Sequence, residues 1–285
     1  VLHTFHGHVF HSYFSPAKTK FFLAIERYLA SRSSAIVAIS AIQKKELTQI
    51  YKVADESKIT VVNLGFDLDR FMNNRESNRN SFRSLYQLEE EVLAIGIIGR
   101  LVSIKNHPMF IKVIKRLKEA TSVNFRVFII GDGEDRLLLE QLCREEGLTY
   151  RSGNEEPASS IITFTSWIKN VEWALAGLDI VALTSYNEGT PVSLIEAQAA
   201  AKPIVTTETG GIADVVLAGE TALLSPSNDY DAFYNNLKLL VEDEGLRKRF
   251  SEKGPEFVRD QFHFQRLVSN MGALYRKLLS KQPAK

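Results

Sequence analysis

Short apolar runs alternate with amphipathic stretches along most of this chain. Each run of branched and aromatic residues ends in a polar or glycine-containing turn, which is typical of parallel strands buried on both faces. Apolar residues at helical spacing follow most of these runs. The predicted strands are residues 1–5, 35–39, 59–62, 92–98, 125–130, 161–164, 180–184, 204–206 and 222–224. This alternation predicts an α/β fold with helices on the faces of parallel sheets.

Several helices follow from the same pattern. Residues 18–33 predict a helix whose apolar side carries Phe21, Phe22, Ile25, Tyr28 and Leu29. Ser40 is a suitable N-cap for the next helix. The polar residues 73–80 are expected to be exposed or mobile. A last helix is predicted over residues 261–279.

The stretch 179–205 is the most informative part of the chain. A buried strand, 180–184, leads into the polar loop 185–189, and Thr190 and Pro191 then predict the start of a helix that ends before Lys202-Pro203. Its amino end would open at the carboxyl end of a parallel sheet, where the amides of Val192, Ser193 and Leu194 have no partner within the helix. Such an end attracts phosphate.

Two carboxylates flank this predicted anion site. Glu188 lies in the loop and Glu196 lies about a turn and a half into the helix, so they cannot be an acid–base couple on one helical face. They are better interpreted as hydroxyl acceptors at opposite ends of one ligand. A nucleotide sugar, with a diol on each side of a diphosphate, fits this layout.

Composition narrows the class of protein. The chain has 285 residues, of which 45% are hydrophobic and 24% charged, as in ordinary globular proteins. Thirty-five Lys and Arg residues balance 34 Asp and Glu residues, which argues against nucleic acid as a partner. No apolar run approaches the ~20 residues that a transmembrane helix needs. The single cysteine, Cys143, is consistent with a reducing cytoplasm.

Four histidines lie close together near the amino end of the sequence. Two of them, His6 and His8, would share a face of an extended chain, as metal ligands can. The others are His3 and His11, and no Cys or Asp accompanies them. We therefore expect no metal and no other cofactor.

Seven motifs, in order along the chain, resemble one large enzyme family. They are IVAIS (36–40), NLGFDLDRF (63–71), GRLVSIKN (99–106), FIIGDGEDR (128–136), LDIVALTS (178–185), EGTPVSLIEA (188–197) and TGGIADVV (209–216). Together they are similar to the retaining glycosyltransferases of GT-B fold called family four, or glycosyl transferases group 1. The resemblance extends over nearly the whole chain.

The resemblance implies a domain organisation. Residues 1–64 would form an incomplete N-terminal Rossmann-like domain, and residues 65–260 a complete C-terminal Rossmann-like domain that binds the nucleotide sugar. Residues 261–285 would form a helix that crosses back to the first domain. Because the family has several strand–helix units before the first strand found here, we expect the chain to be a fragment or a truncated homologue.

The resemblance also implies roles for single residues. Arg100 and Lys105 match the family's cationic pair for the departing diphosphate. His6 matches the histidine whose imidazole approaches the donor sugar, with Gly7 allowing close backbone approach. Glu188 would bind the transferred sugar and Glu196 the ribose. The expected donor contacts are Gly99, Arg100, Lys105, Glu188, Gly189, Thr190, Val192, Ser193, Leu194 and Glu196.

The expected function is transfer of a sugar, with retained stereochemistry, from a nucleotide sugar to a glycan or lipid-linked acceptor. The donor would be UDP-linked and the enzyme cytoplasmic, at most in peripheral contact with the inner face of the membrane. Two alternatives stay open from the sequence. One is a nucleotide-binding module without catalysis, and the other is a sugar-nucleotide epimerase.

Overall fold

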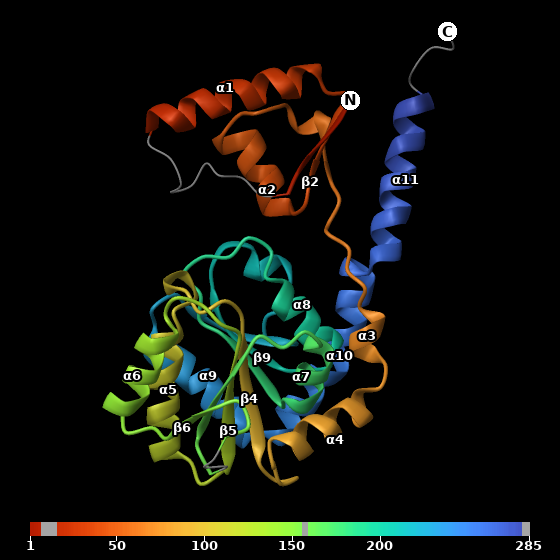
Figure 1. The fold of residues 1–285 in the computed structure, drawn as a ribbon. Coiled ribbons are helices and arrows are strands. Elements are labelled where there is room, and N and C mark those ends of the chain that lie inside the picture. The colour runs from red at the N-terminus through yellow and green to blue at the C-terminus, as the bar shows by residue number, and fades with distance from the viewer. Residues whose placement is uncertain (7–15, 156–158, 281–285) are drawn as a thin grey trace. The chain divides into compact units, whose positions relative to one another are not determined.

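The chain forms two compact units, each described here by itself. The computed structural model describes residues 1–6, 16–155 and 159–280. The first unit comprises Val1–Asp67 and Asp260–Lys285, and the second comprises Leu68–Arg259 (Figure 1). Both are built from parallel strands and helices, which confirms the predicted α/β class.

Three parallel strands make the small sheet of the first unit. Its order is β1-β2-β3, with Leu2 opposite Ala35 and Ile36 opposite Ile59. Because parallel neighbours need crossover connections, a helical segment follows each of the first two strands. The elements are β1 (Leu2–Phe5), α1 (Pro16–Arg32), β2 (Ala35–Ala38), α2 (Ala41–Lys45), the π-helical turn η1 (Glu46–Ile50), the 3-10 turn η2 (Glu56–Lys58), β3 (Ile59–Val61) and α11 (Phe264–Ser280).

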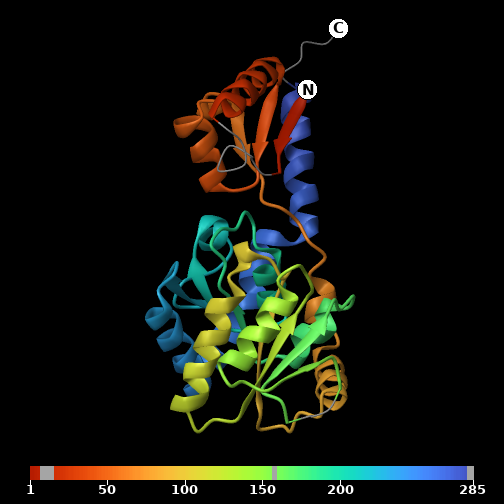
Figure 2. The same cartoon turned by 60° about the vertical axis from the view of Figure 1, so that its left-hand side comes forward.

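Different segments cover the two faces of the small sheet. One face packs against α1 and η1 in a cluster that includes Phe5, Ile36 and Leu47. The other face packs against α11, where Leu274 joins Val37 in a second cluster (Figure 2). Helix α11 therefore belongs to the first unit although it is far from β1–β3 in sequence.

Seven parallel strands make the sheet of the second unit. Their order is β10-β9-β8-β4-β5-β7-β6. The chain runs outward from β4 to one edge and then returns to β8, which pairs with the other side of β4. The strands are β4 (Leu93–Ile98), β5 (Phe125–Ile130), β6 (Tyr150–Ser152), β7 (Ile162–Ser166), β8 (Ile180–Leu183), β9 (Ile204–Glu208) and β10 (Ala222–Pro226). The sheet order thus reverses between β4 and β8.

Helices cover both faces of this sheet (Figures 1 and 2). On one face the main core contains Phe110 of α5, Leu139 of α6 and Phe233 of α9. On the other face Phe82 of α4 packs edge-on against Phe128, with 5.0 Å between ring centroids. The helices are α3 (Asp69–Met72), α4 (Arg75–Leu85), α5 (His107–Ala120), α6 (Arg136–Glu145), α7 (Val171–Gly177), α8 (Val192–Ala199), α9 (Tyr230–Glu242) and α10 (Glu244–Phe262).

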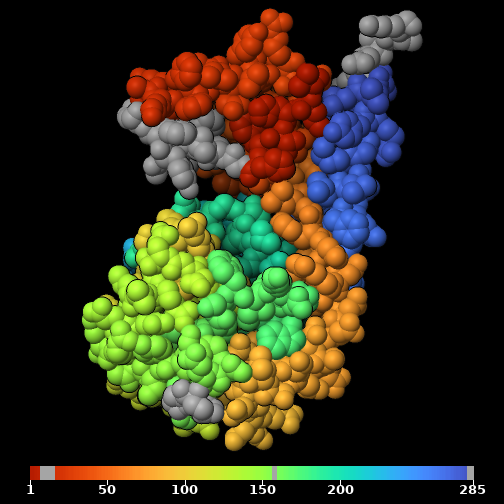
Figure 3. All heavy atoms as spheres, in the orientation of Figure 1, coloured from red at the N-terminus to blue at the C-terminus, as the bar shows by residue number. Residues whose placement is uncertain are grey.

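The polar stretch 73–80 was expected to be exposed or mobile, and the structure shows it mostly exposed, with none of its residues buried. Most of it belongs to α4, which lies on the outside of the second unit (Figure 3). Two arginines of this helix, Arg79 and Arg83, contact Asp179 at 2.8 and 3.3 Å. These ion pairs link α4 to a residue about a hundred positions away. Local polarity could not reveal that support.

The first long helix forms as predicted, but its sheet-facing side differs from the prediction. Phe21, Tyr28 and Leu29 are 64%, 60% and 41% exposed. The side chains that face the small sheet from α1 are Leu23 and Ala30. Helix α1 is apolar on more than one side, so the spacing of its apolar residues did not identify the packed side.

Candidate active site

Loops that follow β4 and β8 lie side by side where the large sheet reverses its order. Ile95 pairs with Ile180 and Ile97 with Ala182, so both strands end at the same edge. Ligands of open α/β sheets bind outside the carboxyl ends of the strands at such a reversal. The two loops, residues 99–106 and 184–191, contain six of the predicted donor-binding residues.

Hydrogen bonds fasten these two loops to each other. The hydroxyl of Thr184 lies 3.0 Å from the carbonyl oxygens of both Lys105 and Asn106. The amide of Tyr186 donates to the carbonyl of Ile104 over 2.8 Å. Thr184 is fully buried, so its hydroxyl is fixed between the loops. The backbone at Lys105 is therefore held against the start of the second loop.

An ion pair joins two of the predicted catalytic residues. Lys105 Nζ lies 2.5 Å from Glu188 Oε1, and the Ser185 hydroxyl donates to the same oxygen over 2.6 Å. The side chains of Lys105 and Glu188 are 23% and 10% exposed, so water screens their attraction less than it would on the surface. The structure brings together one cation suited to phosphate and one carboxylate suited to hydroxyl groups.

The other predicted cation, Arg100, contacts a different residue. Its guanidinium lies 3.4 Å from the carboxylate of Glu134, and both side chains are about two-thirds exposed. An exposed pair of this kind contributes about 1 kcal/mol or less. Release of Arg100 to a ligand phosphate would therefore cost little.

Backbone contact positions the loop that carries Arg100. The amide of Gly99 donates to the carbonyl of Ile130 over 3.0 Å. A Cβ on residue 131 would lie 2.0 Å from the carbonyl oxygen of Gly99, and φ of Gly131 is +139°. Only glycine fits there. The turn after β5 thereby supports the turn after β4.

Helix α8 begins later than the sequence predicted. Its first residue is Val192, and Pro191 rather than Thr190 occupies the N-cap position without a side-chain cap. The amide of Leu194 donates to the carbonyl of Pro191 over 3.0 Å, so the expectation that it lacks a partner was wrong. This bond is the tight first turn by which a helix satisfies some of its terminal amides. Val192 and Ser193 remain the candidates for contact with an anion.

Two glycines after β9 hold the loop that contains Glu188. A Cβ on Gly210 would lie 1.9 Å from the carbonyl oxygen of Glu188, and one on Gly211 would lie 1.9 Å from that of Gly189. The amide of Gly211 also donates to the Glu188 carbonyl over 3.0 Å. The sequence showed this glycine pair only as a turn. No sequence signal predicted this contact, because it depends on the pairing of β9 with β8 in the sheet.

Glu196 occupies a separate, largely buried environment on α8. Its Oε1 lies 3.6 Å from Nη2 of Arg70, and its side chain is 16% exposed. Burial raises the pKa of Glu196 to about 7, the charge of Arg70 lowers it, and that of Glu172 raises it. Near neutral pH this carboxyl group can either accept or donate hydrogen bonds. The sequence did not identify Arg70 as its partner, although Arg70 lies within the motif 63–71.

His6 lies in the first unit, directly after β1, and is exposed. Gly7, His8 and His11 lie outside the described residues. The proposed role of Gly7 therefore stays a prediction, and the alternative metal site falls largely on residues that the structure does not describe. Within the described ranges, no group of three or more His, Cys, Asp or Glu side chains could hold a metal ion. The role of His6 and the independence from metal stay predictions.

Sequence comparison finds two families in this chain. The family described as "Glycosyl transferases group 1" matches residues 78–257, and "Glycosyltransferase Family 4" matches residues 1–70. The D-inositol 3-phosphate glycosyltransferase of Nocardioides sp. is 28% identical over 242 residues, which cover 82% of this chain and 52% of the relative. The capsular polysaccharide biosynthesis glycosyltransferase CapM of Staphylococcus aureus is 25% identical over 255 residues, covering 88% of this chain and 63% of the relative. The chain thus spans little more than half the length of these relatives.

Solved structures share the fold. HepE of Anabaena, crystallised in complex with UDP, superposes with a TM-score of 0.82 at 17% identity, covering 97% of this chain and 72% of HepE. A glycosyltransferase from Rickettsia africae gives a TM-score of 0.80 at 20% identity, covering 99% of this chain and 71% of that protein. These similarities confirm the fold class expected from the sequence.

Proposed function

Because this chain belongs to the glycosyl transferases group 1 family, we propose that it transfers a sugar from a nucleotide diphosphate sugar to a glycan or lipid-linked acceptor. The observation that carries the proposal is the contact between Lys105 and Glu188 at the reversal of the large sheet. One group suits a phosphate and the other suits sugar hydroxyls. We propose UDP as the nucleotide, which the UDP complex of the similar HepE fold supports.

Donor binding would separate the Lys105–Glu188 pair. The ammonium group turns to the diphosphate, and the carboxylate accepts hydrogen bonds from hydroxyls of the transferred sugar. Ser185, which already donates to Glu188, keeps the carboxylate in place during this exchange. The cost of breaking the ion pair is offset because each partner gains a charge-assisted contact with the ligand.

Charge stabilisation is the main catalytic task in this proposal. As the bond from the anomeric carbon to the diphosphate oxygen breaks, negative charge accumulates on the departing diphosphate. Lys105 and Arg100 neutralise this charge together with the amides of Val192 and Ser193 at the amino end of α8. We propose that this machinery works without a metal ion or other cofactor.

The proposed displacement retains the configuration of the sugar. The acceptor oxygen forms its bond on the face from which the diphosphate departs, and the acceptor proton passes to a phosphate oxygen of the leaving group. Glu196 binds the ribose hydroxyls at the far end of the donor. His6 is proposed to contact the donor sugar, as the family resemblance implies.

A cytoplasmic location with peripheral contact at the inner face of the membrane also belongs to this proposal. Among the helices of the described residues, none is long and apolar enough to cross a bilayer. Helix α1 exposes Phe21, Ile25 and Tyr28, and cations at Lys18 and Arg32 flank them. Exposed apolar residues flanked by cations are typical of helices that lie on anionic membranes.

Calorimetric titration with UDP, GDP and ADP tests the nucleotide site. We expect selective binding of UDP that Glu196→Ala weakens, whereas Glu119→Ala, an exposed carboxylate on α5, leaves it unchanged. Equal binding of all three nucleotides, or none, would contradict the proposed donor.

Product analysis tests the reaction. With a UDP-sugar and an acceptor, NMR of the product should show a new glycosidic bond whose anomeric configuration matches that of the donor. An inverted product would refute the displacement proposed here. An isomerised donor would indicate an epimerase, and an unchanged donor a binding module.

A further inference from the structure

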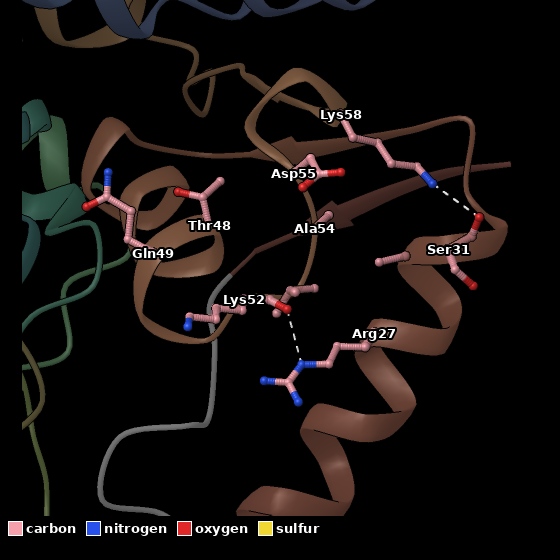
Figure 4. A pocket seen from close by; sticks show the side chains of 10 residues that line it. Arg27, Ser31, Thr48, Gln49, Lys52, Ala54, Asp55 and Lys58 are labelled. Carbon is pink, nitrogen blue, oxygen red and sulfur yellow. Dashed lines mark hydrogen bonds between the residues drawn. The ribbon is translucent and has the colours of Figure 1, made fainter.

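A pocket of about 490 Å³ lies in the first unit (Figure 4), and none of its lining residues is among those proposed for the donor. Its walls come from the end of α1, from η1 and from the segment that leads into β3. These segments approach the amino ends of β2 and β3, whereas His6 follows the carboxyl end of β1. Its volume falls within the range of about 300–1,000 Å³ typical of small-molecule sites.

Arg27 is the most firmly held cation of this pocket. Its Nε donates to the carbonyl of Lys52 over 3.1 Å, and its Nη2 donates to the carbonyl of Tyr51 over 2.7 Å. A guanidinium group has five N–H donors, so these two bonds fix its orientation and leave three donors for a ligand. The side chain extends from α1 toward the turn that carries Lys52 (Figure 4).

Two lysines line the same pocket. Lys58 Nζ donates to the carbonyl of Ser31 over 3.1 Å, which uses one of the three ammonium donors. Lys52 has φ of +47°, a left-handed conformation that is costly for a residue other than glycine. This conformation is part of the turn whose carbonyl groups anchor Arg27.

The pocket has an excess of positive charge. Asp55 is the acidic member of the lining, so the three cations leave a net charge of +2. Between the described residues, no ion pair involves Arg27, Lys52 or Lys58. Hydroxyl groups of Ser31 and Thr48 add polar atoms to the walls.

We propose that this pocket binds a phosphate group. A phosphate monoester carries a charge of about −1.5 to −2 at neutral pH, which matches the net charge of the lining. Its oxygens can accept hydrogen bonds from the planar guanidinium of Arg27 and from an ammonium group that turns toward it. The source is either a soluble phosphate compound or the headgroup of an anionic lipid. The two proposed sites share no residue.

Calorimetric titration with inorganic pyrophosphate tests this site in a Lys105→Ala background, which weakens the donor site. Lys52→Gln should reduce the affinity about tenfold or more, because a hydrogen bond to a charged group is lost. Lys52 is preferred to Arg27 as the main variant because its side chain makes no hydrogen bond or ion pair with another described residue, whereas Arg27 binds two carbonyl groups. Lys45→Gln removes the same charge from α2, outside the pocket, and should leave the affinity unchanged.

Asp55→Asn tests whether the pocket favours a negatively charged ligand. Removal of the carboxylate should tighten pyrophosphate binding, because it removes a like charge from the pocket. Weaker binding by this variant would mean that the carboxylate supports pyrophosphate binding, opposite to the effect of a like charge, and would overturn the proposal.

Sedimentation with lipid vesicles separates the two sources. Binding to phosphatidic acid vesicles that Lys52→Gln abolishes and Lys45→Gln preserves would assign a lipid headgroup. Pyrophosphate binding that depends on Lys52, without such vesicle binding, would assign a soluble phosphate compound. No effect of Lys52→Gln on either ligand would refute the phosphate site, whatever the outcome at the donor site.

Discussion

Glu196→Gln offers a direct test of the environment of this carboxyl group. Burial raises the pKa of Glu196 from 4.5 to about 7, so folding favours the protonated form. The stability that this carboxyl contributes is fully present below pH 4.5 and is lost as the pH rises through about 7. The two pKa values differ by about 2.5, so the total loss of unfolding free energy is roughly 3 kcal/mol, at about 1.36 kcal/mol for each pH unit.

Glutamine keeps the shape of the side chain and removes its ionisation. The variant should therefore gain stability over the wild type, and the gain at pH 8.5 should exceed that at pH 5.5 by about 2 kcal/mol. Urea unfolding followed by tryptophan fluorescence measures this difference, because Trp167 and Trp173 both lie in the second unit with Glu196. Glu119→Gln, whose side chain is 62% exposed, serves as the control and should behave alike at both pH values. An equal effect of Glu196→Gln at both pH values would refute the reasoning.

Three further predictions concern other parts of the second unit. Gly211→Ala should weaken UDP binding about tenfold or more, because the added Cβ would collide with the carbonyl of Gly189 and displace the loop. The control Gly272→Ala, whose Cβ would make only ordinary contacts, should leave UDP binding unchanged. Burial lowers the pKa of Lys202 from 10.5 to about 7, so the wild type should become more stable as the pH rises from 6 to 9. The stability of Lys202→Met relative to the wild type, measured by urea unfolding, should therefore fall over this range, and a rise would contradict the prediction. Burial raises the pKa of the Cys143 thiol to about 12, so Ellman's reagent should react with it at pH 8 only after unfolding, and rapid labelling of the native protein would contradict its burial.

Much of the secondary structure could be predicted because its signals are local. The strand over residues 125–130 has the predicted bounds, and Ser40 caps α2 by accepting a hydrogen bond from the amide of Gln43 over 3.1 Å. The short elements β6 and α7 were not predicted, since three and seven residues give too little periodicity. None of residues 73–80 is buried, as expected, but helix α4 was not predicted, because its ion-pair partner Asp179 is distant in sequence.

The site could be located from its motifs but not assembled from them. Sequence placed Lys105 and Glu188 among the donor-binding residues, yet their ion pair depends on β4 and β8 being neighbours in the sheet. Strand order is a property of the whole unit, and no local pattern encodes it. The contact of Arg70 with Glu196 is of the same kind. The residue types indicated what chemistry the site could perform, whereas the contact partners of these residues could be identified only from the folded structure.

The position of α11 has a consequence for synthesis on the ribosome. The sheet of β1, β2 and β3 is complete once residue 61 has been made, but the helix that covers one of its faces begins at residue 264. About 200 residues must be translated in between, which takes roughly 10–40 s at 5–20 residues per second. During that interval Val37 and Val62 lack their final cover. The second unit, continuous in sequence, can finish folding first, so a nascent chain should need protection from aggregation around β2 and β3.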